Sequence, residues 1–272
     1  LGVCGVVALT TLVSGCVEDD GVVRTDAVFT RGDTGDTGLF LEPQCADPGF
    51  CGCDFTGYDL DGNGSDETCV HDTAVVDGEV QLGARVEAGA EVGENAVLGE
   101  GAVLGTNSIM APRSSVGAGA IIGANVTIGR RAQVGANTRI GDDSTIGRAA
   151  VVGADVDASV GLLSMGYASE IGARSEVTGV GVVLGNLAAV GEDSVLGAGV
   201  VLARGATFGN ETVLGAGVVV GPEVSALDGV QIGAGSRVRK GVIFASDVTL
   251  GSGVRVGRDT ELREGSSVGD DA

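Results

Sequence analysis

Large apolar residues recur at every sixth position over most of the chain. The two blocks 80–157 and 184–267 hold 27 complete hexads, and the first position is large and apolar in 26 of them, Ala226 being the exception. A period of six fits neither an amphipathic helix nor long simple strand alternation. The pattern therefore predicts short strands, each followed by a sharp corner, in a repeat architecture.

The other hexad positions predict how the corners are built. The fifth residue is Ala, Ser, Thr or Val in all 27 hexads, and the second is Gly in 19. The fourth residue is Gly, Asn or Asp in 21 hexads, and these residue types tolerate left-handed backbone angles. We expect the first residue to fill the interior, the fifth to fit a crowded wall, and the fourth to turn the corner.

This pattern resembles the hexapeptide repeat of the left-handed parallel β-helix, written [LIV]-[GAED]-x2-[STAV]-x. The resemblance covers residues 80–272. It implies an all-β solenoid shaped as a triangular prism, with three parallel sheets, three hexads per coil and about ten coils spaced ~4.8 Å apart. In that register Ala226 lies between Phe208 and Phe244 on one interior column, where a small residue offsets two large ones.

The hexad phase is lost only between residues 158 and 183. One interpretation is a bulged coil that the fold tolerates. The other is a binding spot formed by Leu162, Met165, Tyr167 and Glu170, since Tyr167 is the one tyrosine within the repeat region.

The composition narrows the classes of partner. The net charge is −21, from 37 acidic and 16 basic residues. A nucleic-acid partner is not expected, because it requires a basic surface. Binding to anionic lipids by charge alone is disfavoured for the same reason, whereas solubility and cation binding are favoured.

The first residues predict export and a lipid anchor. Residues 1–15 are apolar and too short to span a bilayer, so they are interpreted as a signal peptide. Val13-Ser14-Gly15-Cys16 resembles the bacterial lipobox, which implies lipidation of Cys16; an ordinary signal peptide is the alternative. The expected location is the bacterial outer membrane or cell surface, with the periplasm as alternative. Residues 16–44 are interpreted as a flexible tether.

Residues 45–72 are predicted to form a small cysteine-rich module before the β-helix of residues 73–272. Cys45, Cys51, Cys53 and Cys69 favour two disulfides of open connectivity, because their spacing lacks the paired knuckles of a zinc site, which stays the alternative.

The same module holds a candidate Ca²⁺ loop. Oxygen-bearing residues alternate before Gly64, and the run resembles the calcium loops of extracellular repeats. That resemblance implies five ligands: Asp59, Asp61, Asn63, Ser65 through its carbonyl, and Glu67. An acidic turn without an ion is the alternative.

Relatives of such solenoids include trimeric acyltransferases, in which a histidine is the general base, and carbonic anhydrases, in which three histidines hold a metal. The one histidine here, His71, precedes the first hexad, so a carbonic anhydrase is excluded. The prediction is a non-catalytic surface lipoprotein with a structural or adhesive role, whose protein or glycan partner is not identified. The alternative is a divergent acyltransferase, as a homotrimer, that uses a thioester donor.

Overall fold

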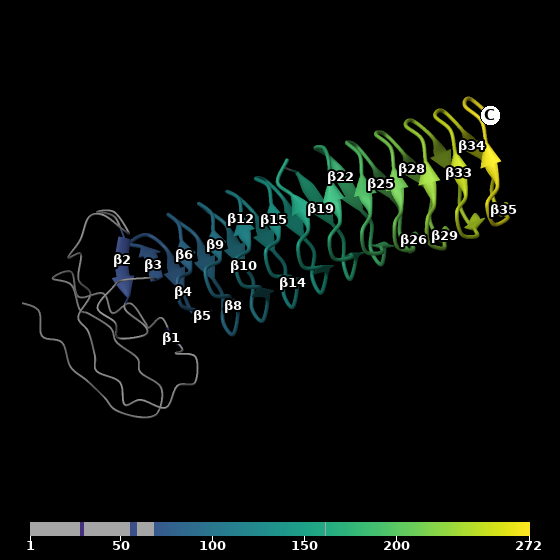
Figure 1. The fold of residues 1–272 in the computed structure, drawn as a ribbon. Coiled ribbons are helices and arrows are strands. Elements are labelled where there is room, and N and C mark those ends of the chain that lie inside the picture. The colour runs from purple at the N-terminus through teal and green to yellow at the C-terminus, as the bar shows by residue number, and fades with distance from the viewer. Residues whose placement is uncertain (1–27, 30–54, 59–67, 161) are drawn as a thin grey trace, which may run out of the picture.

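The computed structural model describes residues 28–29, 55–58, 68–160 and 162–272. All regular elements in these ranges are β-strands, most of them two residues long. Within the described residues, no helix has the length and apolar character to cross a bilayer. The strands follow one another in a straight stack of coils with the C-terminus at its far end (Figure 1).

The strands form three parallel sheets that the chain visits in turn. The first sheet consists of β1 Val28–Phe29, β5 Glu79–Val80, β8 Val97–Leu98, β11 Ser115–Val116, β14 Gln133–Val134, β17 Val151–Val152, β20 Glu170–Ile171, β23 Ala189–Val190, β26 Thr207–Phe208, β29 Ser225–Ala226, β32 Ile243–Phe244 and β35 Glu261–Leu262.

The second sheet consists of β2 Phe55–Tyr58, β3 Thr68–His71, β6 Arg85–Val86, β9 Val103–Leu104, β12 Ile121–Ile122, β15 Arg139–Ile140, β18 Asp157–Ala158, β21 Glu176–Val177, β24 Val195–Leu196, β27 Val213–Leu214, β30 Gln231–Ile232, β33 Thr249–Leu250 and β36 Ser267–Val268.

The third sheet consists of β4 Val75–Val76, β7 Glu91–Val92, β10 Ile109–Met110, β13 Thr127–Ile128, β16 Thr145–Ile146, β19 Leu163–Met165, β22 Val182–Leu184, β25 Val201–Leu202, β28 Val219–Val220, β31 Arg237–Val238 and β34 Arg255–Val256. We call the turns that leave the first, second and third sheets the first, second and third corner.

Each strand pairs in parallel with the strand one coil further on. Ile109 pairs with Thr127, for example, and Thr127 pairs with Thr145, which confirms the predicted register of three hexads per coil. The third sheet has 11 strands, so the solenoid has about 11 coils rather than the predicted ten. The reason is that the pairing begins before the first hexad: β3 pairs in parallel with β6, and antiparallel with β2.

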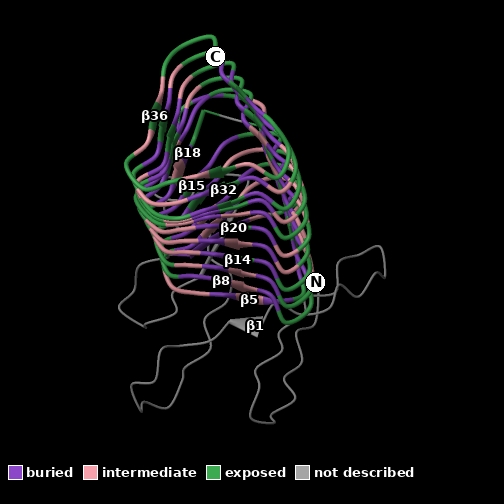
Figure 2. Ribbon diagram, turned by 90° about the vertical axis from the view of Figure 1, so that its right-hand side faces the viewer, coloured by how far each residue is buried: buried purple, intermediate pink, exposed green. Residues whose placement is uncertain are grey.

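The interior is built from the first and fifth hexad positions, as predicted. One continuous apolar core runs through the coils, while exposed residues gather at the turns (Figure 2). Ala226 is 6% exposed and pairs with Phe244, while Phe208 lies one coil before it. The predicted compensation of volumes on this column is confirmed.

The corners confirm the left-handed fourth position. All 27 hexads have a positive φ there, including hexads with a charged residue, such as Arg113 at φ 63°. Polar fifth residues satisfy their hydroxyls in two ways. The Ser108 hydroxyl bridges coils, donating to the Gly123 carbonyl at 2.7 Å and accepting from the Val126 N–H at 3.0 Å, whereas the Ser114 hydroxyl donates to the Ala111 carbonyl of its own corner at 2.6 Å. In the described residues no buried side-chain polar atom lacks a partner.

The loss of phase at 158–183 reflects two coils that are each one residue longer than three hexads. Ile146 pairs with Met165, and Met165 pairs with Leu184. Each added residue is absorbed at the second corner and in a three-residue strand, so both coils keep their strands and their interior packing.

Candidate functional site

A shallow open hollow of about 720 Å³ lies on the third sheet toward the C-terminal end of the described coils. Its apolar floor includes Val219 and Val238, and Gly221 and Pro222 belong to the adjoining third corner. Five bases line the rest: Arg237, Arg239, Lys240, Arg255 and Arg258. The volume lies within the range of ligand-binding pockets.

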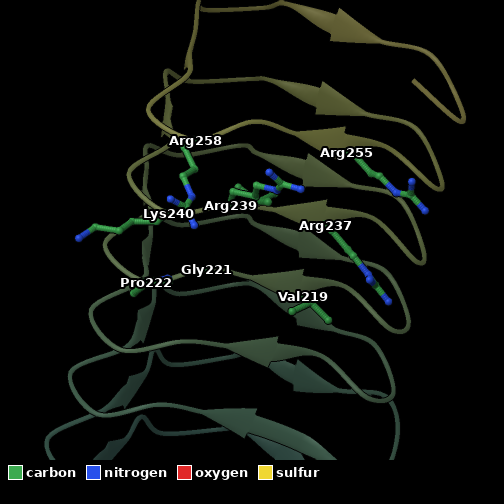
Figure 3. A pocket seen from close by; sticks show the side chains of 9 residues that line it. Val219, Gly221, Pro222, Arg237, Arg239, Lys240, Arg255 and Arg258 are labelled. Atoms are coloured by element: carbon green, nitrogen blue, oxygen red, sulfur yellow. The ribbon is translucent and has the colours of Figure 1, made fainter.

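The repeat itself gathers these bases. Arg237 and Arg255 occupy the outward position of neighbouring strands and are register partners, one coil apart. Their side chains extend to the same side of the sheet, whereas Lys240 and Arg258 come from the third corner at the opposite side (Figure 3). Residues separated by three hexads in the sequence thereby meet on one surface.

The electrostatics of the hollow are those of an anion site. Lys240 Nζ lies 2.9 Å from Glu223 Oε2, at the rim. Among the described residues, the four arginines have no ion-pair partner. Guanidinium groups bind phosphate and carboxylate oxygens in pairs of hydrogen bonds. The hollow is therefore suited to a phosphorylated or carboxylated ligand.

The residues of the predicted binding spot are not brought together as one surface. Met165 is 2% exposed and belongs to the core. Leu162 lies at the second corner, Tyr167 at the third corner, and Glu170 on the outer face of the first sheet. Leu162 and Tyr167 are both about half exposed, so they remain available separately.

Several predicted residues lie outside the described part of the chain: Cys16, Cys45, Cys51, Cys53, Asp59, Asp61, Asn63, Ser65 and Glu67. Cys69 is buried and disulfide-bonded. The pairing of the cysteines, the calcium loop and the lipid anchor stay predictions. In the described ranges, no group of three or more His, Cys, Asp or Glu side chains is placed to hold a metal.

Histidine is placed away from the hollow. His71 lies in β3, many coils from β31 and β34, and its Nδ1 accepts from the Thr73 N–H at 3.1 Å. Among the described carboxylates, the one in contact with a base that lines the hollow is Glu223. Any proton transfer there would therefore involve a carboxylate rather than an imidazole.

Ion pairing shifts the pKa of residues on the first corner. Arg174 bridges Asp193 and Glu192 of the following coil, with Nε 2.8 Å from Asp193 Oδ1. Hydrogen bonding to Asp193 and Glu192 raises the pKa of Arg174, and Arg174 lowers the pKa of Asp193. These pairs join coils and are exposed, so they are structural features of a corner.

The arginine hollow was missed by the sequence analysis, although a signal was present. Six of the 16 basic residues fall between residues 237 and 263, and two pairs of them are separated by three hexads, which is one coil. Net charge conceals such local clustering, whereas the coil register displays it.

Two families match parts of the chain. The family described as bacterial transferase hexapeptide (six repeats) matches residues 95–130, and the family described as hexapeptide repeat of succinyl-transferase matches residues 79–106 and 188–222. No curated protein matched the sequence.

Solved structures of acyltransferases are also similar. UDP-N-acetylglucosamine O-acyltransferase from Moraxella catarrhalis has 17% identity and a TM-score of 0.39, over 68% of this chain and 70% of that chain. UDP-N-acetylglucosamine acyltransferase from Campylobacter jejuni has 17% identity and a TM-score of 0.35, over 68% of this chain and 66% of that chain.

The repeat and the coil define a left-handed parallel β-helix of hexapeptide type. The matched segments are hexapeptide repeats of the kind that transferase families contain, and they lie within this β-helix.

Two predictions are wrong: that the protein has a non-catalytic structural or adhesive role, and that it is not an enzyme. Both matching family models describe hexapeptide repeats of transferases. These predictions failed because they inferred a lack of catalysis from the absence of histidine in the coils, and that absence removes only one kind of general base. It does not remove a ligand site or a carboxylate base.

Proposed function

We propose that the protein is an acyltransferase that moves an acyl group from a thioester donor to a hydroxyl or amine acceptor. The observation that carries the proposal is the hollow of unpaired arginines in a chain of net charge −21. Like charges gathered without partners cost stability unless an anion binds them. The phosphate groups of a thioester donor such as an acyl-coenzyme A supply that anion.

The reaction requires a base and a bound donor. The acceptor oxygen or nitrogen attacks the thioester carbonyl, the C–S bond breaks, and the thiol leaves with the proton that the acceptor loses. We propose Glu223, which is ion-paired with Lys240 of the hollow, as the carboxylate that accepts this proton and passes it to the thiolate. The arginines bind and orient the donor, which converts a bimolecular encounter into an intramolecular one.

We infer further that copies of the chain assemble side by side as a homotrimer. The second corner is apolar where the two longer coils lie, with Leu162 and Val180 exposed by 50% and 56%. Val183 of the third sheet adjoins it, and two coils further on Val219 of the third sheet and Val213 of the second sheet are exposed as well. Contiguous exposed apolar surface favours association. With the second corner at a threefold axis, the hollow would face the neighbouring copy.

The test is donor binding by isothermal titration with coenzyme A, together with thiol release from acetyl- and succinyl-coenzyme A in the presence of amino and hydroxyl sugars. Arg237→Gln with Arg255→Gln is expected to weaken coenzyme A binding by at least ~10-fold, since each charged hydrogen bond contributes about 1.5–3 kcal/mol. The matched control is Arg139→Gln with Arg263→Gln, which removes the same charge elsewhere.

Glu223→Gln should keep donor binding and lose thiol release. Parent protein that neither binds coenzyme A nor releases thiol would refute the proposal. If the control pair of substitutions weakened coenzyme A binding as much as the pair in the hollow, net charge rather than the hollow would control binding. The solution mass of the parent protein tests the trimer separately.

A further inference from the structure

Bases also gather in the N-terminal half of the rod, far from the hollow. Arg113 follows β10, Arg130 and Arg131 follow β13, and Arg148 follows β16, all at the third corner. They belong to consecutive coils: the Arg131 N–H donates to the Pro112 carbonyl at 3.4 Å. With coils ~4.8 Å apart, the four backbones lie within about 10 Å of rod length.

The surfaces beside these arginines carry few compensating charges. Glu94 precedes Arg113 by one coil on the same corner, where its carbonyl accepts from the Arg113 N–H at 3.0 Å, and Glu91 and Glu170 lie on the adjoining sheets one coil before and one coil after the cluster. In the same three coils, the outward residues of the two adjoining sheets are uncharged: Ile109, Thr127, Thr145, Ser115, Gln133 and Val151. None of the four arginines has an ion pair within the described residues. The third corner is therefore locally positive, although the chain as a whole is strongly acidic.

Apolar side chains follow on the same corner in the next two coils. Tyr167 is 51% exposed and Leu187 is 46% exposed. They are neighbours in the stack, because the Leu187 N–H donates to the Tyr167 carbonyl at 2.9 Å. Their position on an outer corner, rather than in the core, is unfavourable in water.

A second basic group continues the corner. Arg204 follows β25, and Lys240 and Arg258 follow β31 and β34. The backbone ladder is continuous here too, since the Glu223 N–H donates to the Arg204 carbonyl at 3.1 Å and the Asp259 N–H to the Lys240 carbonyl at 3.0 Å. Two acids, Glu223 and Asp259, lie on the same stretch, and Glu223 is ion-paired with Lys240. The order along this edge is thus basic, apolar, and then mixed with an excess of bases.

We propose that this edge, the basic corner, rests on an anionic lipid surface. Guanidinium groups would bind lipid phosphates and carboxylates, while Tyr167 and Leu187 enter the boundary between head groups and acyl chains. A soluble polyanion such as an acidic polysaccharide would engage the arginines, but it gives no account of the two apolar side chains between them.

The net charge of −21 does not oppose this contact strongly. Charges on the other corners act through solvent, and physiological salt screens them over about 8 Å. The basic corner acts at contact distance. Lys240 and Arg258 of this edge also line the hollow. The proposal nevertheless depends neither on lipidation of Cys16 nor on acyl transfer, because the four N-terminal arginines, Tyr167 and Leu187 lie outside the hollow.

The test is co-sedimentation of the full chain, carrying Cys16→Ser in every sample, with vesicles of phosphatidylcholine alone or of phosphatidylcholine mixed with phosphatidylserine. Arg113→Asn, Arg130→Gln and Arg148→Gln together should weaken binding to the anionic vesicles by roughly 100-fold, at about fivefold per arginine. The control Arg139→Gln, Arg174→Asn and Arg263→Gln removes the same charge, and also replaces one left-handed arginine by Asn.

The apolar part of the proposal has its own readout. The chain contains no tryptophan, so Tyr167→Trp introduces a single reporter, whose emission should shift to the blue with anionic vesicles. The proposal is overturned if the parent protein ignores anionic vesicles, if the control triple loses binding equally, or if the reporter does not shift. Binding to heparin without binding to vesicles would overturn it in favour of a polyanion partner.

Discussion

Three substitutions of glycine by alanine separate the two reasons why the repeat uses glycine. A Cβ atom on Gly117, at the second hexad position, would lie 2.5 Å from the backbone nitrogen of Ala136 and 2.8 Å from the carbonyl carbon of Gly135, one coil away. Gly205, at the fourth position, has a φ of +66° and no atom within 4 Å of an added Cβ. Gly257, at the second position, would meet only the Thr260 hydroxyl, at 3.5 Å.

The magnitudes follow from these differences. Gly117→Ala forces two coils apart, and such overpacking costs about 1–3 kcal/mol of unfolding free energy. Gly205→Ala introduces no crowding, but alanine disfavours the left-handed backbone conformation at this position, which costs about 1–2 kcal/mol of unfolding free energy. Gly257→Ala has neither problem and should stay within about 0.5 kcal/mol of the parent protein.

Urea unfolding followed by far-UV circular dichroism measures all three. Gly205→Asn distinguishes the causes further, because Asn tolerates the left-handed region and should recover most of the loss at that site. If Gly117→Ala proved as stable as Gly257→Ala, close stacking of the coils would not explain glycine at the second position.

Three other predictions concern the core, the titration of a corner and the untested calcium loop. Phe244→Ala should cost about 3–5 kcal/mol, measured by the same unfolding assay, since its ring is fully buried; a loss under about 1 kcal/mol would contradict the packing. Hydrogen bonds from the Ser159 hydroxyl and N–H lower the pKa of Asp157 in the folded protein. Asp157 therefore contributes its full stabilisation above the pKa it has in the unfolded chain, and this stabilisation is lost as the pH falls through its lower pKa in the folded protein. Ser159→Ala should raise that pKa in an NMR titration, and an unchanged value would refute the assignment. Millimolar Ca²⁺ should raise the melting temperature of the parent protein but not of Asp61→Ala with Glu67→Ala; no shift in the parent would remove the hypothesis.

The fold was predictable because each hexad position has one dominant physical requirement. The fourth position illustrates this most clearly: Gly, Asn and Asp predicted a left-handed corner, and Leu187 and Glu211 adopt it as well. The surrounding register imposes the conformation even on residues that disfavour it. The location of the two added residues was less predictable, because a second corner accommodates an extra residue without losing a buried side chain.

The candidate site was not predicted, because a net charge of −21 conceals a local cluster of bases. Arg237 and Arg255 are far apart in the sequence and adjacent on the surface, and only the register of three hexads per coil joins them. The absence of histidine from the hexads also received too much weight. It bears on one choice of base, whereas the matching transferase repeats define the scaffold.

The two charged corners differ in a way that stability alone does not explain. On the first corner Arg174 meets Asp193 and Glu192 of the following coil, so opposite charges stack, as a stable solenoid favours. On the third corner Arg130 and Arg148 stack with no acid beside them in those coils. Like charges in register destabilise neighbouring strands. A corner that retains them in a chain with more than twice as many acids as bases is therefore best explained by an anionic partner that compensates the repulsion.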